Sequence, residues 1–140
     1  MANLKEKHQV FIPRWYGDLH NAIKVQLLGF PDASMGAYGC CIYIRIIHHD
    51  DSKSTSLITS KSRVSPIKPL SIPKLELQGA FLLSKLITQV KSELSLLVDI
   101  SGIYCWCDSM AVLHWINGDS KKFNRCLCRD VWSKSGRWSV

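Results

Sequence analysis

Three short runs of strand-forming residues separated by polar breaks fill the first half of the chain. Residues 25–30 are almost entirely apolar, residues 40–47 are rich in β-branched and aromatic side chains, and residues 55–60 (Thr-Ser-Leu-Ile-Thr-Ser) predict a third strand. The nearly unbroken apolar run at residues 25–30 is typical of a strand in the middle of an α/β sheet. The breaks, a turn at residues 36–39 and a polar loop at residues 48–54, are short. The three strands are therefore predicted to form an antiparallel meander.

The pattern takes a helical period from residue 73 to about residue 98. Its apolar stripe consists of Ala80, Leu83, Ile87, Val90, Leu94 and Leu97. Pro73 suits the first helical position, at the end of a linker at residues 61–74 whose other prolines exclude a helix. Extending the stripe four residues back from Ala80 predicts Glu76 in the first turn, on the face meant for the core.

Residues 102–107 predict a fourth strand that leads directly into Asp108 and a short helix at residues 110–116. A strand that follows a crossover helix returns parallel to its sheet, so Asp108 is expected at the carboxyl end of a parallel strand. The chain thus predicts an α/β fold with a mixed sheet. Residues 25–118 form its core, residues 1–24 a lead-in segment and residues 119–140 a tail of weak periodicity.

Charge adds a candidate partner to this fold. Lys and Arg outnumber Asp and Glu by 18 to 11, and a net charge of +7 favours a polyanion such as nucleic acid. The chain shows no secretory signal and no apolar run of the roughly 20 residues that span a bilayer, which predicts an intracellular protein. The six cysteines are then expected to be reduced, small buried side chains. A zinc-binding interaction module remains an alternative, although no Cys-x-x-Cys pair is present.

Three carboxylates occupy notable places: Asp32 follows the first strand, Glu76 lies on the helix and Asp108 follows the fourth strand. Each has an ordinary explanation, as a turn residue, a partner of the helix dipole and a helix cap respectively. The topology nevertheless allows all three to converge. Convergent carboxylates without thiolate or imidazole form a hard-oxygen site suited to Mg²⁺ or Mn²⁺. Two such ions about 4 Å apart can hydrolyse a phosphodiester.

This element order, with Asp, Glu and Asp at these places, resembles the ribonuclease H fold. Four stretches are similar to the ribonuclease H-like region of BEL/Pao-type LTR retrotransposon polyproteins: residues 28–34 (Leu-Gly-Phe-Pro-Asp-Ala-Ser), 61–66 (Lys-Ser-Arg-Val-Ser-Pro), 70–77 (Leu-Ser-Ile-Pro-Lys-Leu-Glu-Leu) and 105–109 (Cys-Trp-Cys-Asp-Ser). The resemblance covers about residues 10–125. It implies hydrolysis of RNA in RNA–DNA hybrids, with Asp32 bridging two metal ions and with Glu76 and Asp108 holding one of them. It also implies reverse transcriptase and integrase domains as partners in a parent polyprotein.

Basic residues near the carboxylates are candidates for contact with nucleic acid. The resemblance implies Lys61 and Arg63 as contacts to the hybrid. Lys68 and Lys74 belong to the same basic segment, which leads into the helix that carries Glu76, and such a segment can hold phosphates. Ser34, beside the first carboxylate, is the remaining candidate for nucleic-acid binding.

The resemblance also implies a fourth carboxylate after a fifth strand, and nothing in the sequence matches it. Residues 138–140 are similar to the start of that strand, and Asp119 and Asp130 precede the required position. We therefore expect a C-terminally incomplete domain with one weak metal site, little or no hydrolysis and an exposed fourth strand. The alternatives are a catalytically inactive nucleic-acid-binding relic and an aspartic peptidase. The peptidase is disfavoured because Asp108-Ser109-Met110 is not an Asp-Thr-Gly or Asp-Ser-Gly loop.

Overall fold

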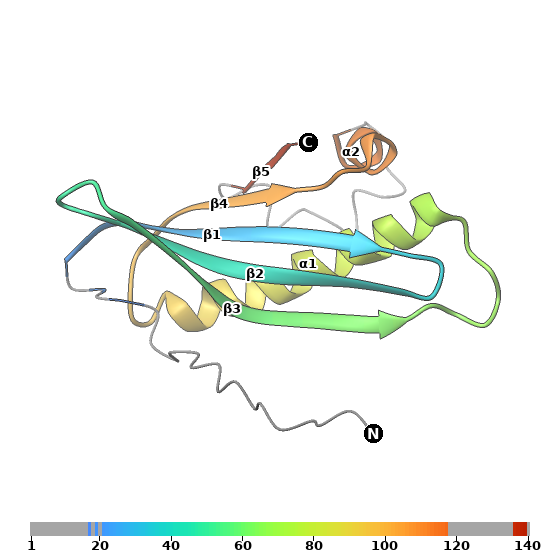
Figure 1. The fold of residues 1–140 in the computed structure, drawn as a ribbon, viewed down its shortest axis with the longest axis horizontal. Coiled ribbons are helices and arrows are strands. Elements are labelled where there is room, and N and C mark those ends of the chain that lie inside the picture. The colour runs from blue at the N-terminus through green and yellow to red at the C-terminus, as the bar shows by residue number, and fades with distance from the viewer. Residues whose placement is uncertain (1–16, 18, 20, 118–135, 140) are drawn as a thin grey trace, which may run out of the picture.

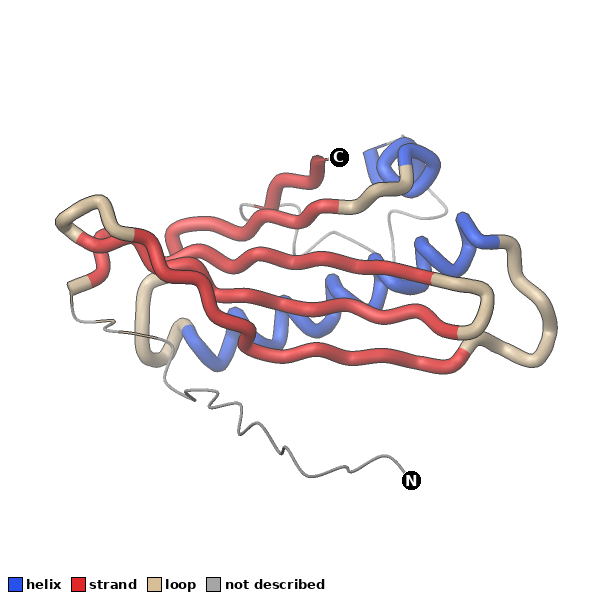
Figure 2. Tube along the Cα trace, viewed as in Figure 1, coloured by secondary structure: helices blue, strands red, loops and turns tan. Residues whose placement is uncertain are grey.

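The computed structural model describes residues 17, 19, 21–117 and 136–139. The elements in chain order are β1 (Ala22–Ala33), β2 (Ala37–His48), β3 (Lys53–Val64), α1 (Ile72–Leu94), β4 (Ile100–Trp106), α2 (Met110–Asn117) and β5 (Gly136–Ser139). One five-stranded sheet has the order β3-β2-β1-β4-β5. β1, β2 and β3 pair antiparallel, whereas β4 is parallel to β1 and β5 is parallel to β4. α1 crosses one face of this sheet (Figures 1 and 2).

The predicted fold class is confirmed: an antiparallel meander, a crossover helix, a parallel fourth strand and a short second helix follow one another. The expectation of an exposed fourth strand is wrong, because β5 pairs with β4 from Ile103 to Trp106. Backbone pairing thus reaches one strand beyond the predicted edge. Most of the lead-in segment and of the tail, with Asp119 and Asp130, lies outside the described residues.

The strands are longer than their apolar runs, and two predicted boundaries are wrong. The turn between β1 and β2 is closed by the Ser34 N–H, which donates to the Ala37 carbonyl at 2.7 Å. Gly39 lies inside β2, where an added Cβ would approach the Lys61 carbonyl oxygen at 3.0 Å. Residues 61–64 belong to β3 and not to a linker. Backbone pairing extends β3 into this polar stretch because hydrogen bonds between strands do not require apolar side chains.

α1 covers the face of the sheet that carries the aliphatic core. Leu27 of β1 and Ile42 of β2 are fully buried against Leu83 and Ile87 of the helix, which confirms the middle of the predicted stripe. The helix ends at Leu94, and Leu97 beyond it is 78% exposed, so the predicted end near residue 98 is too late. Neither of the two described helices combines the length and the apolar composition needed to cross a membrane.

Candidate active site

The parallel strands β1 and β4 stop pairing near one edge of the sheet. Their last pair is Gly29 with Cys105, and Asp32 and Asp108 each lie three residues beyond it. Figure 1 shows the ends of β1 and β4, the beginning of α1 and the whole of α2 at this end of the molecule. Open α/β sheets bind ligands at the carboxyl ends of their strands. The structure therefore brings two predicted site residues to the expected edge.

Asp32 is a strand residue and does not form the turn. It pairs with Gly39 in the β1–β2 ladder, its side chain is exposed, and its Oδ1 accepts a hydrogen bond from the Ala33 N–H at 2.8 Å. The turn itself uses Ser34, whose hydroxyl donates to the Ala37 carbonyl at 3.2 Å. The explanation of Asp32 as a turn residue is therefore wrong. Ser34, a predicted contact to nucleic acid, has its hydroxyl engaged within the turn.

Asp108 is likewise not the cap of the helix that follows it. The Ser109 hydroxyl accepts from the Val112 N–H at 3.4 Å, and the Ser109 carbonyl accepts from the Leu113 N–H at 3.0 Å. Ser109 thus occupies the N-cap position of α2. The exposed Asp108 side chain follows the carboxyl end of β4.

Glu76 is the fifth residue of α1, because the helix begins at Ile72, and no acidic residue lies in the first turn. Its predicted place in the first turn is therefore wrong, and its half-buried side chain leaves the helix where the dipole's influence has weakened. Gly79, three residues later, packs against the end of β1. A Cβ added there would lie 3.2 Å from the Asp32 carbonyl oxygen and 3.3 Å from that of Gly39. This close backbone contact brings the segment that carries Glu76 to the end of β1.

The charges of two carboxylates affect the pKa of the Cys107 thiol. Burial raises its pKa, a hydrogen bond with the Ser109 backbone lowers it, and the negative charges of Asp108 and Glu76 raise it further. Glu76 and Asp108 therefore lie within electrostatic reach of one thiol. Strand alternation places the Asp32 side chain on the face of the sheet opposite α1, together with Phe30. Within the part of the chain that the structure describes, no three His, Cys, Asp or Glu residues form a group that could hold a metal ion.

The carboxylate segments thus share one edge of the sheet without closing into a cluster. Their donor set, three carboxylates, has the oxygen chemistry that Mg²⁺ and Mn²⁺ prefer. Of the basic candidates, Lys61 and Arg63 are exposed residues of β3, opposite Cys40 and Tyr38 of β2. Lys68 is exposed in the loop before α1, and Lys74 is exposed in the first turn of α1.

Gly79 is the positioning residue that the sequence prediction missed. A glycine inside a helix costs roughly 1 kcal/mol relative to alanine, so its presence within a helical pattern is a signal of close packing. The contact with β1 supplies that packing reason.

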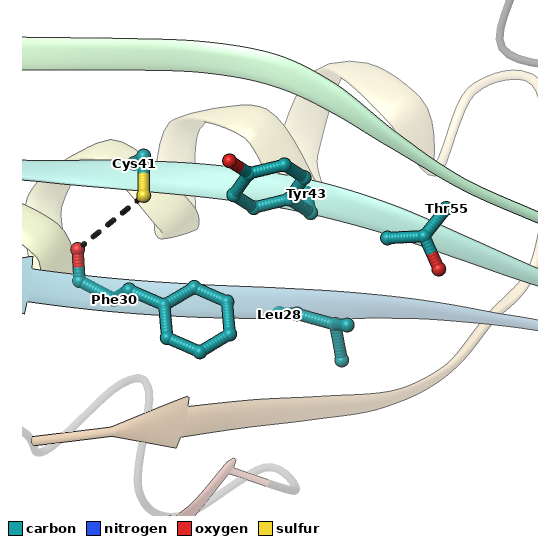
Figure 3. Close-up of a pocket in the computed structure, with 5 residues that line it drawn as sticks. All are labelled: Leu28, Phe30, Cys41, Tyr43 and Thr55. Atoms are coloured by element: carbon teal, nitrogen blue, oxygen red, sulfur yellow. Dashed lines mark hydrogen bonds between the residues drawn. The ribbon is translucent and has the colours of Figure 1, made fainter.

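The face of the sheet opposite α1 carries a second, apolar hollow of about 380 Å³ (Figure 3). It is lined by Leu28, Phe30, Cys41, Tyr43 and Thr55. The Phe30 ring stacks on Trp106 at 5.3 Å and meets the edge of Tyr43 at 5.9 Å. No carboxylate or cation is among these described lining residues, so the hollow offers neither metal nor phosphate chemistry.

The prediction of buried cysteines is confirmed for Cys40, Cys105 and Cys107. Cys41 is half-buried, and its Sγ donates to the Phe30 carbonyl at 3.8 Å. The remaining pair, at positions 126 and 128, lies outside the described residues. The described cysteines thus serve mainly as small packing residues of the sheet.

Comparisons with known proteins add a family assignment to this geometry. A model of the Pao retrotransposon-like RNaseH-like domain matches residues 1–109. An RNase H1 structure, LC11-RNase H1 in complex with RNA/DNA hybrid, is 13% identical over 70% of this chain and 64% of its own, with a TM-score of 0.36. A Ppx/GppA family member from Aquifex aeolicus is 12% identical over 82% of this chain and 35% of its own, also with a TM-score of 0.36. The chain thus spans less than two thirds of either structure. No curated protein matches the sequence.

Proposed function

Because the chain belongs to the Pao retrotransposon-like RNaseH-like domain family, we propose that it binds RNA–DNA hybrids and hydrolyses their RNA strand. The observation that carries the proposal is the convergence of three carboxylate segments on the end of β1 and β4. In particular, Gly79 holds the helix of Glu76 against the backbone of Asp32. Glu76 and Asp108 also act on the same thiol of Cys107.

Asp32, Glu76 and Asp108 are the proposed ligands of Mg²⁺ or Mn²⁺, with Asp32 shared between two ions. When bound, such ions would activate a water molecule and stabilise the leaving oxygen of the phosphodiester. Lys61, Arg63, Lys68 and Lys74 are the proposed phosphate contacts, with Ser34 as a neighbour of the site. Their charge and the net +7 of the chain suit a polyanionic substrate. The parent reverse transcriptase and integrase domains are proposed as partners within a polyprotein.

We expect slow turnover by the 140-residue chain, because three carboxylates hold one ion well and a second ion weakly. A second candidate function follows from the same observation. The chain would then bind hybrids through its basic residues without hydrolysing them. Binding of the hybrid depends on the basic side chains, whereas hydrolysis also needs the second metal ion. The two functions can therefore be separated experimentally.

The test combines hybrid cleavage with Mn²⁺ binding measured by calorimetry. Asp32→Asn, Glu76→Gln and Asp108→Asn each remove one proposed ligand, and Asp99→Asn is the matched control because this exposed residue precedes the opposite end of β4. We expect each site variant to lower Mn²⁺ affinity by at least about tenfold and to remove the slow cleavage of a labelled hybrid. The control should behave as the parent.

The outcomes separate the candidates. Equal Mn²⁺ affinity in Asp32→Asn and Asp99→Asn contradicts the metal site. Salt-sensitive binding of the hybrid without Mn²⁺-dependent cleavage selects the binding-only function. Fast multiple-turnover cleavage by the 140-residue chain contradicts the expectation of slow turnover.

A further inference from the structure

A polar groove of about 240 Å³ lies between α1 and the end of β3, apart from the carboxylate edge. Its lining residues are Tyr38, Arg63, Gln78, Phe81, Leu82 and Lys85. Leu82 is buried in the core beneath it, whereas Arg63, Gln78 and Lys85 are exposed. The groove therefore has an apolar floor and a polar rim.

The groove lies beside the edge strand β3 because α1 packs chiefly on β1 and β2. Arg63 pairs with Tyr38 across the β2–β3 ladder, and Tyr38 packs against the core beneath the helix. Opposed residues of an antiparallel pair share a face, so Arg63 stands on the helix side of β3. The end of β3, with Arg63, and the flank of α1 are the two walls of the groove.

Each polar side chain at the rim carries a hydrogen-bond donor. Arg63 brings a guanidinium, Lys85 an ammonium, Gln78 an amide and Tyr38 a hydroxyl. Lys85 Nζ lies 4.3 Å from the centroid of the Phe81 ring, a cation–π contact that holds the ammonium at the groove. Gln78 and Lys85 are seven residues apart and share one helix face.

No carboxylate is among the described residues that line the groove. Glu76, the nearest acidic residue of the helix in sequence, precedes Gln78 by two positions and so lies about 200° around the helix axis. Two cations over an apolar floor, with neutral donors between them, match the chemistry of a phosphate group. An arginine guanidinium can bind phosphate oxygens in bidentate fashion.

The groove lies within reach of the carboxylate edge. Ala33, Tyr38 and Arg63 form one row across β1, β2 and β3, next to the row of Asp32. Strands are spaced about 4.8 Å apart, which puts the Arg63 backbone about 10 Å from β1. A nucleic-acid strand rises about 3.4 Å per nucleotide, so about three nucleotides bridge this distance.

We propose that the Arg63–Lys85 groove binds one backbone phosphate of the nucleic acid whose scissile phosphate lies at the carboxylate edge. This inference rests on the proposed function and adds a second anchoring point to it. Both cations contact the same phosphate, with Gln78 and Tyr38 as further donors. The groove thereby fixes the direction in which a strand crosses the end of β1.

The test measures binding of a fluorescently labelled RNA–DNA hybrid by anisotropy over a salt series, in EDTA so that divalent ions make no contribution. The variants are Arg63→Gln, Lys85→Gln and the double substitution. Lys53→Gln, at the start of β3, and Lys91→Gln, in the last turn of α1, are matched controls. Losing one phosphate contact lowers the slope of log K against log salt by about 0.9, or about eightfold in affinity at 0.1 M salt.

Because both side chains hold one phosphate, we expect each single groove variant to lose only part of this slope, since the remaining cation still neutralises the phosphate. The double variant should lose about 0.9 in all. Control variants should retain the parent slope. Equal losses in groove and control variants indicate diffuse surface charge and overturn the groove. A double variant whose slope falls by about 1.8, the value for two phosphate contacts, overturns the shared phosphate.

The two proposals fail in distinguishable ways. Groove variants that bind the hybrid like the controls, in a chain whose Mn²⁺ affinity depends on Asp32, overturn only the groove. If Asp32→Asn binds Mn²⁺ as tightly as the parent, while the groove variants lose hybrid affinity in EDTA, only the metal site is overturned. A parent that binds no hybrid at low salt overturns both.

Discussion

The two faces of the sheet are built from different side chains and are held together differently. On the face covered by α1, aliphatic residues such as Leu27, Ile42 and Ile44 are fully buried. On the opposite face, the Phe30 ring contacts the rings of Tyr43 and Trp106, and Phe30 remains 37% exposed. Burial beneath a helix stabilises the first face, whereas ring contacts between neighbouring strands organise the second. The difference shows that alternate residues of the same strands perform separate tasks.

The candidate site lies where these two faces meet, at the ends of the strands. Asp32 belongs to the open face, and Glu76 reaches the same edge from the helix on the covered face. Packing of α1 therefore controls how closely the two carboxylates approach. The open face contributes to the site through the strand that carries Asp32.

The largest loss of stability is expected when a buried side chain of the covered face is truncated. Leu83 is fully buried beneath the sheet, so Leu83→Ala should lower the free energy of unfolding by about 3 kcal/mol. Phe30→Ala, on the open face, should cost only about 1 kcal/mol because its ring is already partly in water. Urea unfolding followed by circular dichroism measures both. Equal costs would contradict the distinction between the faces.

A smaller effect is expected where the covered face meets the site. Gly79→Val forces side-chain atoms against the carbonyl oxygens of Asp32 and Gly39, and overpacking of this kind costs about 2 kcal/mol. Mn²⁺ affinity should fall as well, because the helix carrying Glu76 moves away from β1. Gly79→Ala is the control. The higher helix propensity of alanine stabilises the helix by about 1 kcal/mol, which offsets the cost of moving the neighbouring carbonyl oxygens by a few tenths of an ångström. Unchanged Mn²⁺ affinity in a folded Gly79→Val variant would contradict the positioning role.

The smallest effect compares the faces through two adjacent cysteines of β2. Burial on the covered face, with the negative charge of Cys41, raises the pKa of Cys40 from 9.0 to about 11, against a lowering by Lys61. A raised thiol pKa stabilises the fold fully below pH 9, and this contribution is lost as pH rises towards 11. Between pH 8 and pH 10, the free energy of unfolding should therefore fall by about 1 kcal/mol more in the parent than in Cys40→Ala.

Cys41→Ala provides the matched control on the open face. Burial also raises the pKa of Cys41, but its side chain is only half-buried. The pH-dependent difference between the parent and Cys41→Ala should therefore be smaller. Identical pH dependence in the two cysteine variants would show that the faces do not differ in polarity at this position.

Sequence patterns predicted the elements better than their ends. The apolar run at residues 25–30 located β1, but the strand extends to Ala33 because pairing with β2 continues through Asp32. In the same way, β3 includes Lys61 and Arg63, whose polar side chains had indicated a linker. Local composition reports burial, and these strand ends are exposed. Only their partners across the ladder show that they belong to the sheet.

The sequence by itself determined the order of the elements, the aliphatic stripe of α1 and the positions of the three carboxylates along the chain. Hydrophobic periodicity carries that information because each element must bury one face. Tertiary structure decided what the periodicity does not encode: that Ser109 and not Asp108 caps α2, that Gly79 lies against Asp32, and that Arg63 and Lys85 share a groove. Each of these depends on contacts between segments far apart in sequence or on competition between neighbouring caps, and such contacts leave no period in the chain.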